Sequence, residues 1–339
     1  MSRLTISRAD GLLSVQDMGR PGHLGQGLSC GGAMDRMALI EAAALLGADT
    51  PLAAIEMAGA GGVFGVDAPM RVALTGAPMA AFLDDAPLRW HGCHLILPGQ
   101  ALRIGGVDSG VYGYLTPAGG IATPEWLGSR AAHLSIGIGA LLDSGDDLPC
   151  GEDPDPDRPA RVIEPAVRFG GGTLRVMDGP QTGLFADDVL EAFYAAGFRR
   201  GQRANRQGIL VQTGKGCFTS DHAGGLASDV IGPGDVQLTG EGVPFVLMAE
   251  CQTMGGYPRI GRVIPADLPR IAQAAEGAAL RFQRLDASQA DALWRDDAAL
   301  LREAAGRCRN LIREPSTIAD LLSYQLVGGV TAGRELEDE

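Results

Sequence analysis

Lysine is almost absent from this sequence. Lys215 is the only lysine among 28 lysine and arginine residues in a chain of 339. It lies in a Gly-Lys-Gly sequence without the flanking methionines of a biotin attachment site, which excludes covalently bound biotin. The same sequence lacks the Ser or Thr with which a phosphate-binding loop holds magnesium, and the upstream glycine, Gly208, lies one position too far away. Autonomous ATP binding by such a loop is therefore not predicted.

Basic tracts and long apolar runs are also missing. The net charge is −13 and the pI is about 4.8, so we expect no surface that binds the phosphates of a nucleic acid. The richest apolar region, residues 42–66, contains Asp49 and Glu56, and the N-terminal segment is interrupted by Arg3 and Arg8. Neither a membrane span nor a signal peptide is predicted. We expect a soluble protein.

The cysteines and histidines do not form a recognisable ligand pattern. The six cysteines include no Cys-x-x-Cys pair, which is typical of reduced thiols, and we expect a cytoplasmic location. His91 and His94 flank Cys93, but in a strand their odd spacing would send the two imidazoles to opposite faces. We expect them at the surface or hydrogen-bonded. His133 and His222 have no spaced partners, so no metal site is predicted.

Glycine and proline, by contrast, are frequent. The chain has 50 glycines and 20 prolines but only 5% aromatic residues, a composition that favours many short strands joined by turns. Its one obvious linker, GEDPDPDRPA, is charged, rich in proline and has little to bury. We predict a mainly β fold with a few helices. Its expected parts are a first β domain at residues 1–150, a linker at 151–165, a second β domain at 166–285 and a helical C-terminal extension at 286–339.

One helix can be predicted with its ends. Asp35 is placed to accept a hydrogen bond from the first turn, as N-cap residues do. Met37, Ile40 and Ala44 recur at helical spacing, and Gly47 suits the left-handed conformation that ends many helices. A glycine-punctuated loop, residues 16–35, delivers the chain to this helix.

The densest group of polar side chains lies in residues 250–273, after an apolar run that is typical of a buried strand. A carboxylate, an amide, a hydroxyl and a phenol follow within eight residues, from Glu250, Gln252, Thr253 and Tyr257. The pair Gly255-Gly256 lets the backbone turn or approach a ligand closely, since it has no Cβ. This arrangement favours a binding loop on a rigid sheet. The alternative is a tight hairpin whose polar residues satisfy their own backbone.

A serine motif earlier in the chain has weaker support. Gly27-Leu-Ser29-Cys-Gly31 matches the G-x-S-x-G sequence of hydrolase nucleophiles. That motif requires a preceding strand, and the sequence PGHLGQG cannot form one. A serine nucleophile is therefore not predicted from the sequence.

Several short motifs occur together in an order that resembles one family. They are GRPG at 19–22, GGAMD at 31–35, TPAGGI at 116–121, LGSR at 127–130, DGPQ at 178–181 and ECQTMGGYP at 250–258. Over residues 14–285 the chain resembles the family that contains allophanate hydrolase subunit 2, KipA, the C subunit of bacterial 5-oxoprolinase and the carboxyltransferase domain of urea carboxylase. The resemblance implies two cyclophilin-like β-barrel domains in tandem.

The resemblance also implies partners and two possible chemistries. Family members work with a KipI-type protein, and the active site lies in the cleft they share. One chemistry is ATP-dependent opening of the 5-oxoproline lactam, with a LamB/YcsF-type subunit. The other is carboxyl transfer from carboxybiotin to a urea-like amide, with a biotin carboxylase and a carrier. In both, ATP or carboxybiotin is supplied through the partners. The alternatives are a non-catalytic module that antagonises a KipI-type kinase inhibitor, and a scaffold whose catalytic groups lie in the partner.

Through these motifs, the resemblance assigns expected site residues to numbered positions of this chain. The residues expected to orient a small amide substrate are Gln252, Thr253, Gly255, Gly256 and Tyr257. Arg20 or Arg206 would neutralise developing negative charge, and Glu250 or Asp35 would accept the amide proton. Asp35 could equally be only a helix cap.

Two departures from the family pattern lie beside these residues. Cys251 occupies a position where the family usually has arginine, and in the motif of residues 204–208 Ala204 and Asn205 stand where the family has its serine and its acid, while Arg206 and Gly208 are kept. The departures concern the substrate and leave the expected fold unchanged.

Overall fold

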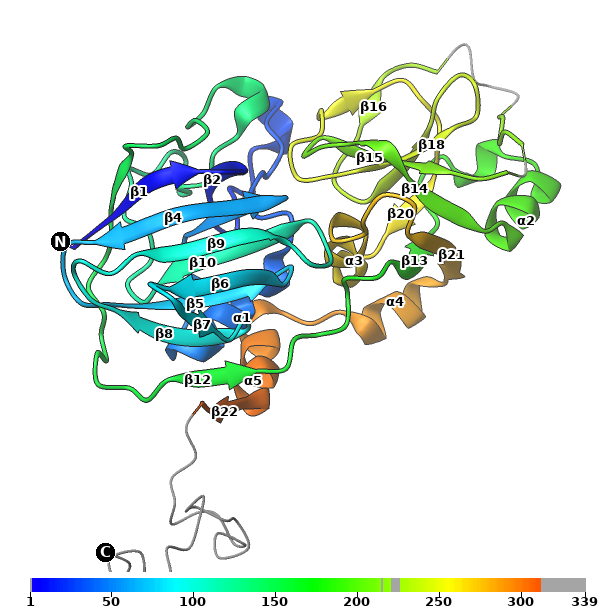
Figure 1. Cartoon of the computed structure of the whole chain (residues 1–339). Coiled ribbons are helices and arrows are strands. Elements are labelled where there is room, and N and C mark those ends of the chain that lie inside the picture. The colour runs from blue at the N-terminus through cyan, green and yellow to red at the C-terminus, as the bar shows by residue number, and fades with distance from the viewer. Residues whose placement is uncertain (1, 215, 221–225, 312–339) are drawn as a thin grey trace, which may run out of the picture.

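The computed structural model describes residues 2–214, 216–220 and 226–311. Within them the chain forms two strand-rich halves with few helices (Figure 1). The predicted mainly β architecture is confirmed. Lys215, His222 and the segment 312–339, which includes the end of the predicted C-terminal extension, lie outside the described residues.

The first half consists of two antiparallel sheets. One sheet has the order β11 (Asp147–Pro149), β1 (Arg3–Ala9), β4 (Ala60–Val66), β9 (Leu102–Val107), β6 (Met79–Leu83), β7 (Ala86–Leu88). The other has the order β2 (Leu12–Gln16), β3 (Ala54–Ala58), β10 (Tyr112–Pro117), β5 (Met70–Gly76), β8 (Gly92–Ile96), β12 (Arg161–Ile163), β22 (Cys308–Asn310). A buried cluster that includes Leu4, Ile55, Phe64 and Leu115 combines side chains from both sheets, and it forms the core of this half.

Helix α1 (Arg36–Leu46) packs on the second of these sheets. Its ends are those predicted from the sequence. The Asp35 carboxylate accepts a hydrogen bond from the Ala38 amide at 3.3 Å, and Gly47 adopts the left-handed conformation with φ of 78°. Nine of its eleven residues are buried, because β5 covers one side and α5 (Asp297–Arg307) covers another.

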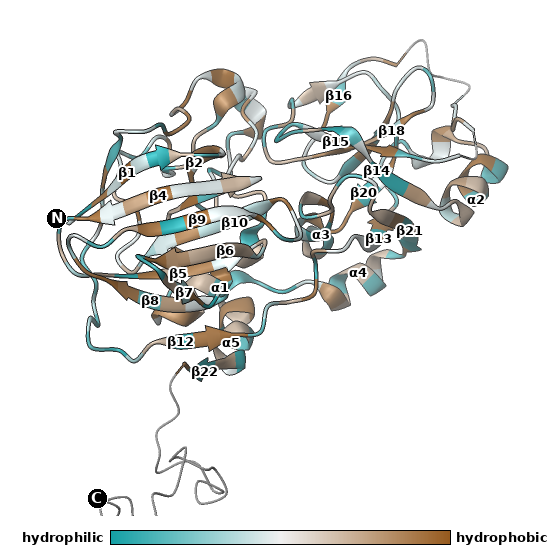
Figure 2. Ribbon diagram, in the orientation of Figure 1, coloured by the Kyte–Doolittle hydropathy of each residue, from teal (hydrophilic) through white to brown (hydrophobic). Residues whose placement is uncertain are grey.

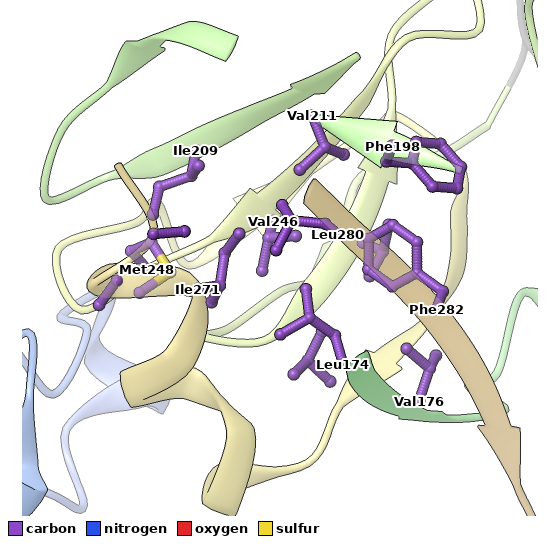
Figure 3. Close-up of a cluster of buried hydrophobic side chains, with 14 of the residues drawn as sticks. Leu174, Val176, Phe198, Ile209, Val211, Val246, Met248, Ile271, Leu280 and Phe282 are labelled. Carbon is purple, nitrogen blue, oxygen red and sulfur yellow. The ribbon is translucent and has the colours of Figure 1, made fainter. Parts of the chain in front are cut away.

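The second half is a closed barrel of seven strands. Their order is β13 (Gly172–Met177), β20 (Arg259–Val263), β17 (Asp235–Leu238), β18 (Pro244–Leu247), β15 (Gly208–Gln212), β14 (Phe198–Ala204), β21 (Ala279–Leu285). Apolar side chains fill its interior, among them Leu174, Val211, Val246 and Phe282 (Figure 3). The remaining elements here are α2 (Asp187–Ala195), α3 (Leu268–Ala272), α4 (Ala287–Leu293) and the short pair β16 (Asp229–Val230) and β19 (Met254–Gly255).

The segment 151–165 differs from the linker that the sequence predicts. Its end forms β12, which pairs with β8 and with β22, and Figure 2 shows this strand as hydrophobic. Val162 and Ile163 are buried there, and this burial explains why the segment does not stay free. Asp153, in its charged part, is held by Arg71 through two hydrogen bonds of 2.7 Å.

The C-terminal extension returns to the first half. After the barrel, α4 leads to α5 beside α1, and β22 then joins the edge of the second sheet (Figure 1). Segments from both ends of the described chain therefore contribute to one layer. None of the helices in the described ranges has the length and apolar character that crossing a membrane requires.

Three buried histidines make the stability of this fold sensitive to acid. The Nε2 of His91 lies 2.9 Å from the Gly76 carbonyl, and the Nε2 of His94 lies 2.7 Å from the Arg89 carbonyl, so both are hydrogen-bonded. Burial is the main cause that lowers the pKa of His91, His94 and His133 below 6.5. Below pH 6.5 the unfolded chain therefore binds protons that the folded chain does not.

We expect the free energy of unfolding to fall as the pH drops from 7 to 5.5, by up to about 1.4 kcal/mol per pH unit for each of the three histidines. Urea denaturation at several pH values measures this slope. In the variant His94→Gln the slope should decrease, since one titrating group is removed. An unfolding free energy that is constant over this range would contradict the prediction.

Candidate functional site

An open cavity of about 550 Å³ lies against the loop that the sequence singled out. Gln252 and Tyr257 from this loop line it, together with residues of β14, β15, β17 and β18. Five of its lining side chains carry an amide group: Gln202, Asn205, Gln207, Gln237 and Gln252. Among the described lining residues, Arg203 is the only charged one. The cavity can therefore bind a small polar molecule through neutral donors and acceptors and one positive charge.

Two neighbouring turns form the rim of the cavity. One turn, residues 205–208, connects β14 to β15, and the other, residues 248–251, follows β18. The Glu250 amide donates to the Arg206 carbonyl at 2.7 Å, and the Met248 amide donates to the Gln207 carbonyl at 2.9 Å. The side chain of Asn205 accepts from the amides of the following turn at 2.8 and 3.1 Å. These bonds fix the backbone from which the amide side chains project.

Glu250 and Arg206 themselves face away from the cavity, toward the first half of the chain. The Arg206 guanidinium is ion-paired with Glu250 and with Glu56 of β3, and it donates to the Gly32 carbonyl at 2.6 Å. Both carboxylates are buried. The pKa of Arg206 is raised by these two carboxylates despite the opposing effect of burial. The arrangement is a buried charge bridge between the two halves, and none of its three residues lines the cavity.

A second polar cluster adjoins the other oxygen of Glu250. The Oγ of Ser29 lies 2.8 Å from the Nε2 of His133, and the Nδ1 of His133 lies 3.0 Å from the Oγ of Ser135. The nearer carboxylate oxygen of Glu250 is 3.8 Å from this Nδ1 and accepts from the Ser135 amide at 3.2 Å. Ser29 and His133 are each 2% exposed.

Arg20 lies beside this cluster with its guanidinium incompletely paired. Its side chain is 1% exposed and donates to the carbonyls of Trp126 and Ala131. Its Nη1 has no hydrogen-bond partner among the described residues. A Cβ added to Gly31 would lie 3.3 Å from this Nη1 and 3.3 Å from the Cδ2 of His133, so both groups border the same glycine.

Asp35 occupies a third place and is fully buried. Besides capping α1, it accepts from Arg168 at 2.6 Å and from Gln273 at 2.8 Å. Arg168 also binds Glu41 at 2.7 and 3.0 Å. Burial is the main cause that raises the pKa of Asp35, and Arg168 opposes it. These contacts account for Asp35 without a substrate.

The predicted substrate-binding residues of the loop thus fall into two groups. Gln252 and Tyr257 are exposed to the cavity, whereas Thr253 is buried and its carbonyl accepts from the Ile231 amide at 3.0 Å. Gly255 pairs with β16, and a Cβ there would lie 2.8 Å from the Gln237 side chain. At Gly256 the atom nearest to an added Cβ would be the Leu226 carbonyl oxygen at 3.4 Å, an ordinary van der Waals contact, so close packing beneath the rim requires a glycine only at Gly255.

Cys251, which departs from the family pattern, also lines the cavity. Its thiol is buried, and burial is the main cause that raises its pKa to about 12. The side chain is therefore a neutral apolar group at neutral pH. An arginine at this position would add a second positive charge to the cavity. With cysteine there, Arg203 is the one charged side chain among the described lining residues.

Sequence reasoning missed four residues of this region. Glu56 lay inside an apolar strand, Arg203 stood in no motif, and His133 had no spaced partner. Ser29 carried a signal in its G-x-S-x-G sequence, although no strand was expected before it. The structure agrees on that point, since a short 3-10 turn, Leu24–Gln26, precedes Ser29. Among the described residues, no group of three or more His, Cys, Asp or Glu side chains is placed to hold a metal ion.

Comparisons with known proteins give the same family as the motifs. The family described as the carboxyltransferase domain, subdomain A and B, matches residues 26–284. The C subunit of 5-oxoprolinase from Escherichia coli (strain K12) is 33% identical over 312 residues, which cover 91% of this chain and 99% of that protein.

Solved structures share the fold. The crystal structure of TTHA0988 has a TM-score of 0.74 at 29% identity and covers 84% of this chain and 56% of that chain. The urea carboxylase of Kluyveromyces lactis has a TM-score of 0.79 at 21% identity, over 89% of this chain and 29% of that chain. This chain thus spans about half the length of TTHA0988 and under a third of the urea carboxylase.

Proposed function

The chain belongs to this carboxyltransferase-domain family, and from that premise we propose that it is the C subunit of an enzyme that opens the lactam of 5-oxoproline with ATP. The end-to-end similarity to the C subunit of a 5-oxoprolinase supports the proposal, because the relationship includes nearly all of both chains. The partner is a KipI-type protein, and a LamB/YcsF-type protein is the third component of the enzyme. ATP enters through these partners, and no covalent cofactor is required.

The lining of the 550 Å³ cavity is the observation that carries this function. 5-Oxoproline is a small lactam that bears one carboxylate. Its planar amide matches the amide side chains of Gln252, Gln207 and Gln237, which can both donate and accept hydrogen bonds. Its carboxylate matches Arg203, whose guanidinium offers two parallel donors and lies 5.4 Å from the ring centre of Phe245. Urea has no charge that would use Arg203.

The remaining residues act through the backbone of the rim. Arg206 and Glu250 face the other half of the chain, so we assign them to holding the two turns in register. Asp35 and Arg20 lie in separate buried clusters and do not line the cavity. The groups that contact the substrate are therefore among the lining residues: Gln252, Gln207, Gln237, Tyr257 and Arg203. The KipI-type partner would close the open side of the cavity.

Reconstitution with the partner proteins tests the proposal. We expect ATP hydrolysis that depends on 5-oxoproline and does not respond to urea. Carboxylation of urea by a complex with biotin carboxylase and carrier, without any response to 5-oxoproline, would support the carboxyltransferase alternative and contradict the proposal. A third outcome would support the regulatory module. In it, the complex with the KipI-type partner turns over neither 5-oxoproline nor urea, and this chain prevents the partner from inhibiting its kinase.

In the reconstituted enzyme, Arg203→Ala should raise the KM for 5-oxoproline about tenfold with little change in kcat. The loss corresponds to about 1.4 kcal/mol, because the carboxylate is bound equally in the ground state and the transition state. Arg262→Ala is a matched control, since Arg262 is exposed and does not line the cavity. A KM for Arg203→Ala equal to that of the wild type would exclude Arg203 from carboxylate binding.

A further inference from the structure

We propose that Ser29 is a nucleophile, activated by His133, that accepts the acyl group of a small ester or amide. This inference goes beyond the proposed function, since it concerns a different site and needs neither ATP nor a partner protein. The site consists of Ser29, His133, Ser135, Glu250 and the unpaired nitrogen of Arg20.

The distances match those of a serine and its general base. Ser29 Oγ and His133 Nε2 are 2.8 Å apart, within the range required for proton transfer between them. The two residues are 104 positions apart in the sequence, and only the packing of the 16–35 loop against residues 131–138 brings them together. In the folded chain, the serine of the motif Gly27-x-Ser29-x-Gly31 thus has His133 as its general base, a pairing that the sequence did not reveal.

On the other edge of the ring, the Nδ1 atom of His133 faces two groups that can accept a hydrogen bond. Nδ1 faces the Ser135 hydroxyl at 3.0 Å and the Glu250 carboxylate at 3.8 Å. These partners favour the tautomer that carries its proton on Nδ1, which leaves Nε2 free to take the proton of Ser29. Burial, the main cause, and the cations Arg20 and Arg206 lower the pKa of His133, whereas Glu250 opposes them. The imidazole is therefore neutral at neutral pH, as a general base must be.

Arg20 supplies a donor for the negative charge that an acyl transfer creates. Its Nη1 is buried and has no partner among the described residues, a state that costs free energy unless a ligand uses it. It borders Gly31 together with the imidazole. In the proposed reaction this group stabilises the oxyanion formed by attack of Ser29, because a buried charge acts strongly on a developing negative charge.

Ser29 is 2% exposed, so the proposal requires the chain beside it to move, and we assign this movement to the exposed loop that precedes it. Residues 24–27 are exposed, and Cβ atoms added at Gly22 or Gly25 would meet nothing within 4 Å. The backbone at these two glycines is loosely surrounded, in contrast to the tightly packed Gly32, where a Cβ would lie 2.7 Å from a backbone nitrogen. Ile136, on the facing turn, is 54% exposed.

The reaction balances without a further reactant except water. Ser29 Oγ forms a bond to the acyl carbon, His133 Nε2 takes the hydroxyl proton, and the bond from the acyl carbon to the leaving oxygen or nitrogen breaks. The imidazolium returns its proton to the leaving group. Water then attacks the serine ester by the same path and releases the acid, which restores Ser29.

A fluorophosphonate probe tests the proposal on the full chain. Attack by Ser29 would break the P–F bond and form an Oγ–P bond, with fluoride leaving and the proton taken by His133. We expect the wild type to gain the mass of one probe less that of HF, and peptide mass spectrometry to place the adduct on Ser29. Labelling should be lost in Ser29→Ala and slowed about 100-fold or more in His133→Gln, because general base catalysis contributes at least that factor.

Ser14→Ala is the matched control, since Ser14 is a buried serine that bonds Gln16 and has no histidine partner. Its labelling should equal that of the wild type. Thermal unfolding of each variant checks that the fold is intact, and the mapped site on the wild type needs no variant at all. A folded wild type without label on Ser29, or equal labelling rates in His133→Gln, would overturn the proposal and leave the 5-oxoproline function untouched.

Discussion

Replacing Arg168 with leucine is expected to lower the free energy of unfolding by about 3–5 kcal/mol. Arg168 is buried between the carboxylates of Asp35 and Glu41, which are fully buried themselves. It donates to Asp35 at 2.6 Å and to Glu41 at 2.7 and 3.0 Å. Its removal leaves two carboxylates in an apolar environment with their main counter-charge gone.

The loss of stability in Arg168→Leu should depend on pH, and the two buried carboxylates decide whether it grows or shrinks as the pH rises. Without Arg168, burial raises the pKa of Asp35 further above that of the unfolded chain. Stability is then lost as the pH rises through the raised pKa, since only the protonated acid is tolerated. We expect a smaller destabilisation at pH 5 than at pH 8, measured by urea denaturation.

An exposed ion pair provides the control for Arg168. Arg284 pairs with Asp178 at the surface, where both side chains are about half exposed. Arg284→Leu should cost at most about 1 kcal/mol, because water screens such a pair. Equal losses for the two variants would mean that the buried cluster contributes no more to stability than an exposed ion pair.

The fold was predictable where local chemistry decides it. The ends of α1 follow from Asp35 and Gly47, whose roles depend only on neighbouring residues. Composition and motifs predicted the mainly β class and the family, and both are confirmed. Strand β12 was not predictable in the same way. Its partner β22 comes from residues 308–310, and no local pattern shows that these two short segments will pair.

The candidate site was also predictable only in part. Gln252 and Tyr257 could be found from the sequence, because polar residues beside a Gly-Gly pair indicate a binding loop. The direction in which each neighbouring side chain points could not be predicted. Glu250 and Gln252 are two positions apart, yet one pairs with Arg206 toward the first half and the other lines the cavity. That outcome depends on the turn at residues 248–251, whose bonds to residues 205–208 are tertiary.

Replacing Gln252 with alanine should lower kcat/KM of the reconstituted enzyme at least about 100-fold, a loss of about 2.7 kcal/mol of transition-state stabilisation. Gln252 is exposed at the rim of the cavity and directly follows the turn whose backbone is fixed by the bond from the Glu250 amide to the Arg206 carbonyl. Its amide can bind the lactam as the carbonyl group gains negative charge, and that interaction grows toward the transition state. The effect should therefore appear mainly in kcat, unlike that of Arg203→Ala.

Met254 supplies the matched control in the same loop. It is half exposed, belongs to β19 and does not line the cavity, so Met254→Ala should leave kcat and KM unchanged. Both variants should unfold at the temperature of the wild type, because truncation of an exposed side chain costs little stability. Gln252→Glu separates charge from shape, since a carboxylate would repel the developing negative charge while filling the same space. A kcat for Gln252→Ala within threefold of the wild type would place the lactam elsewhere in the molecule.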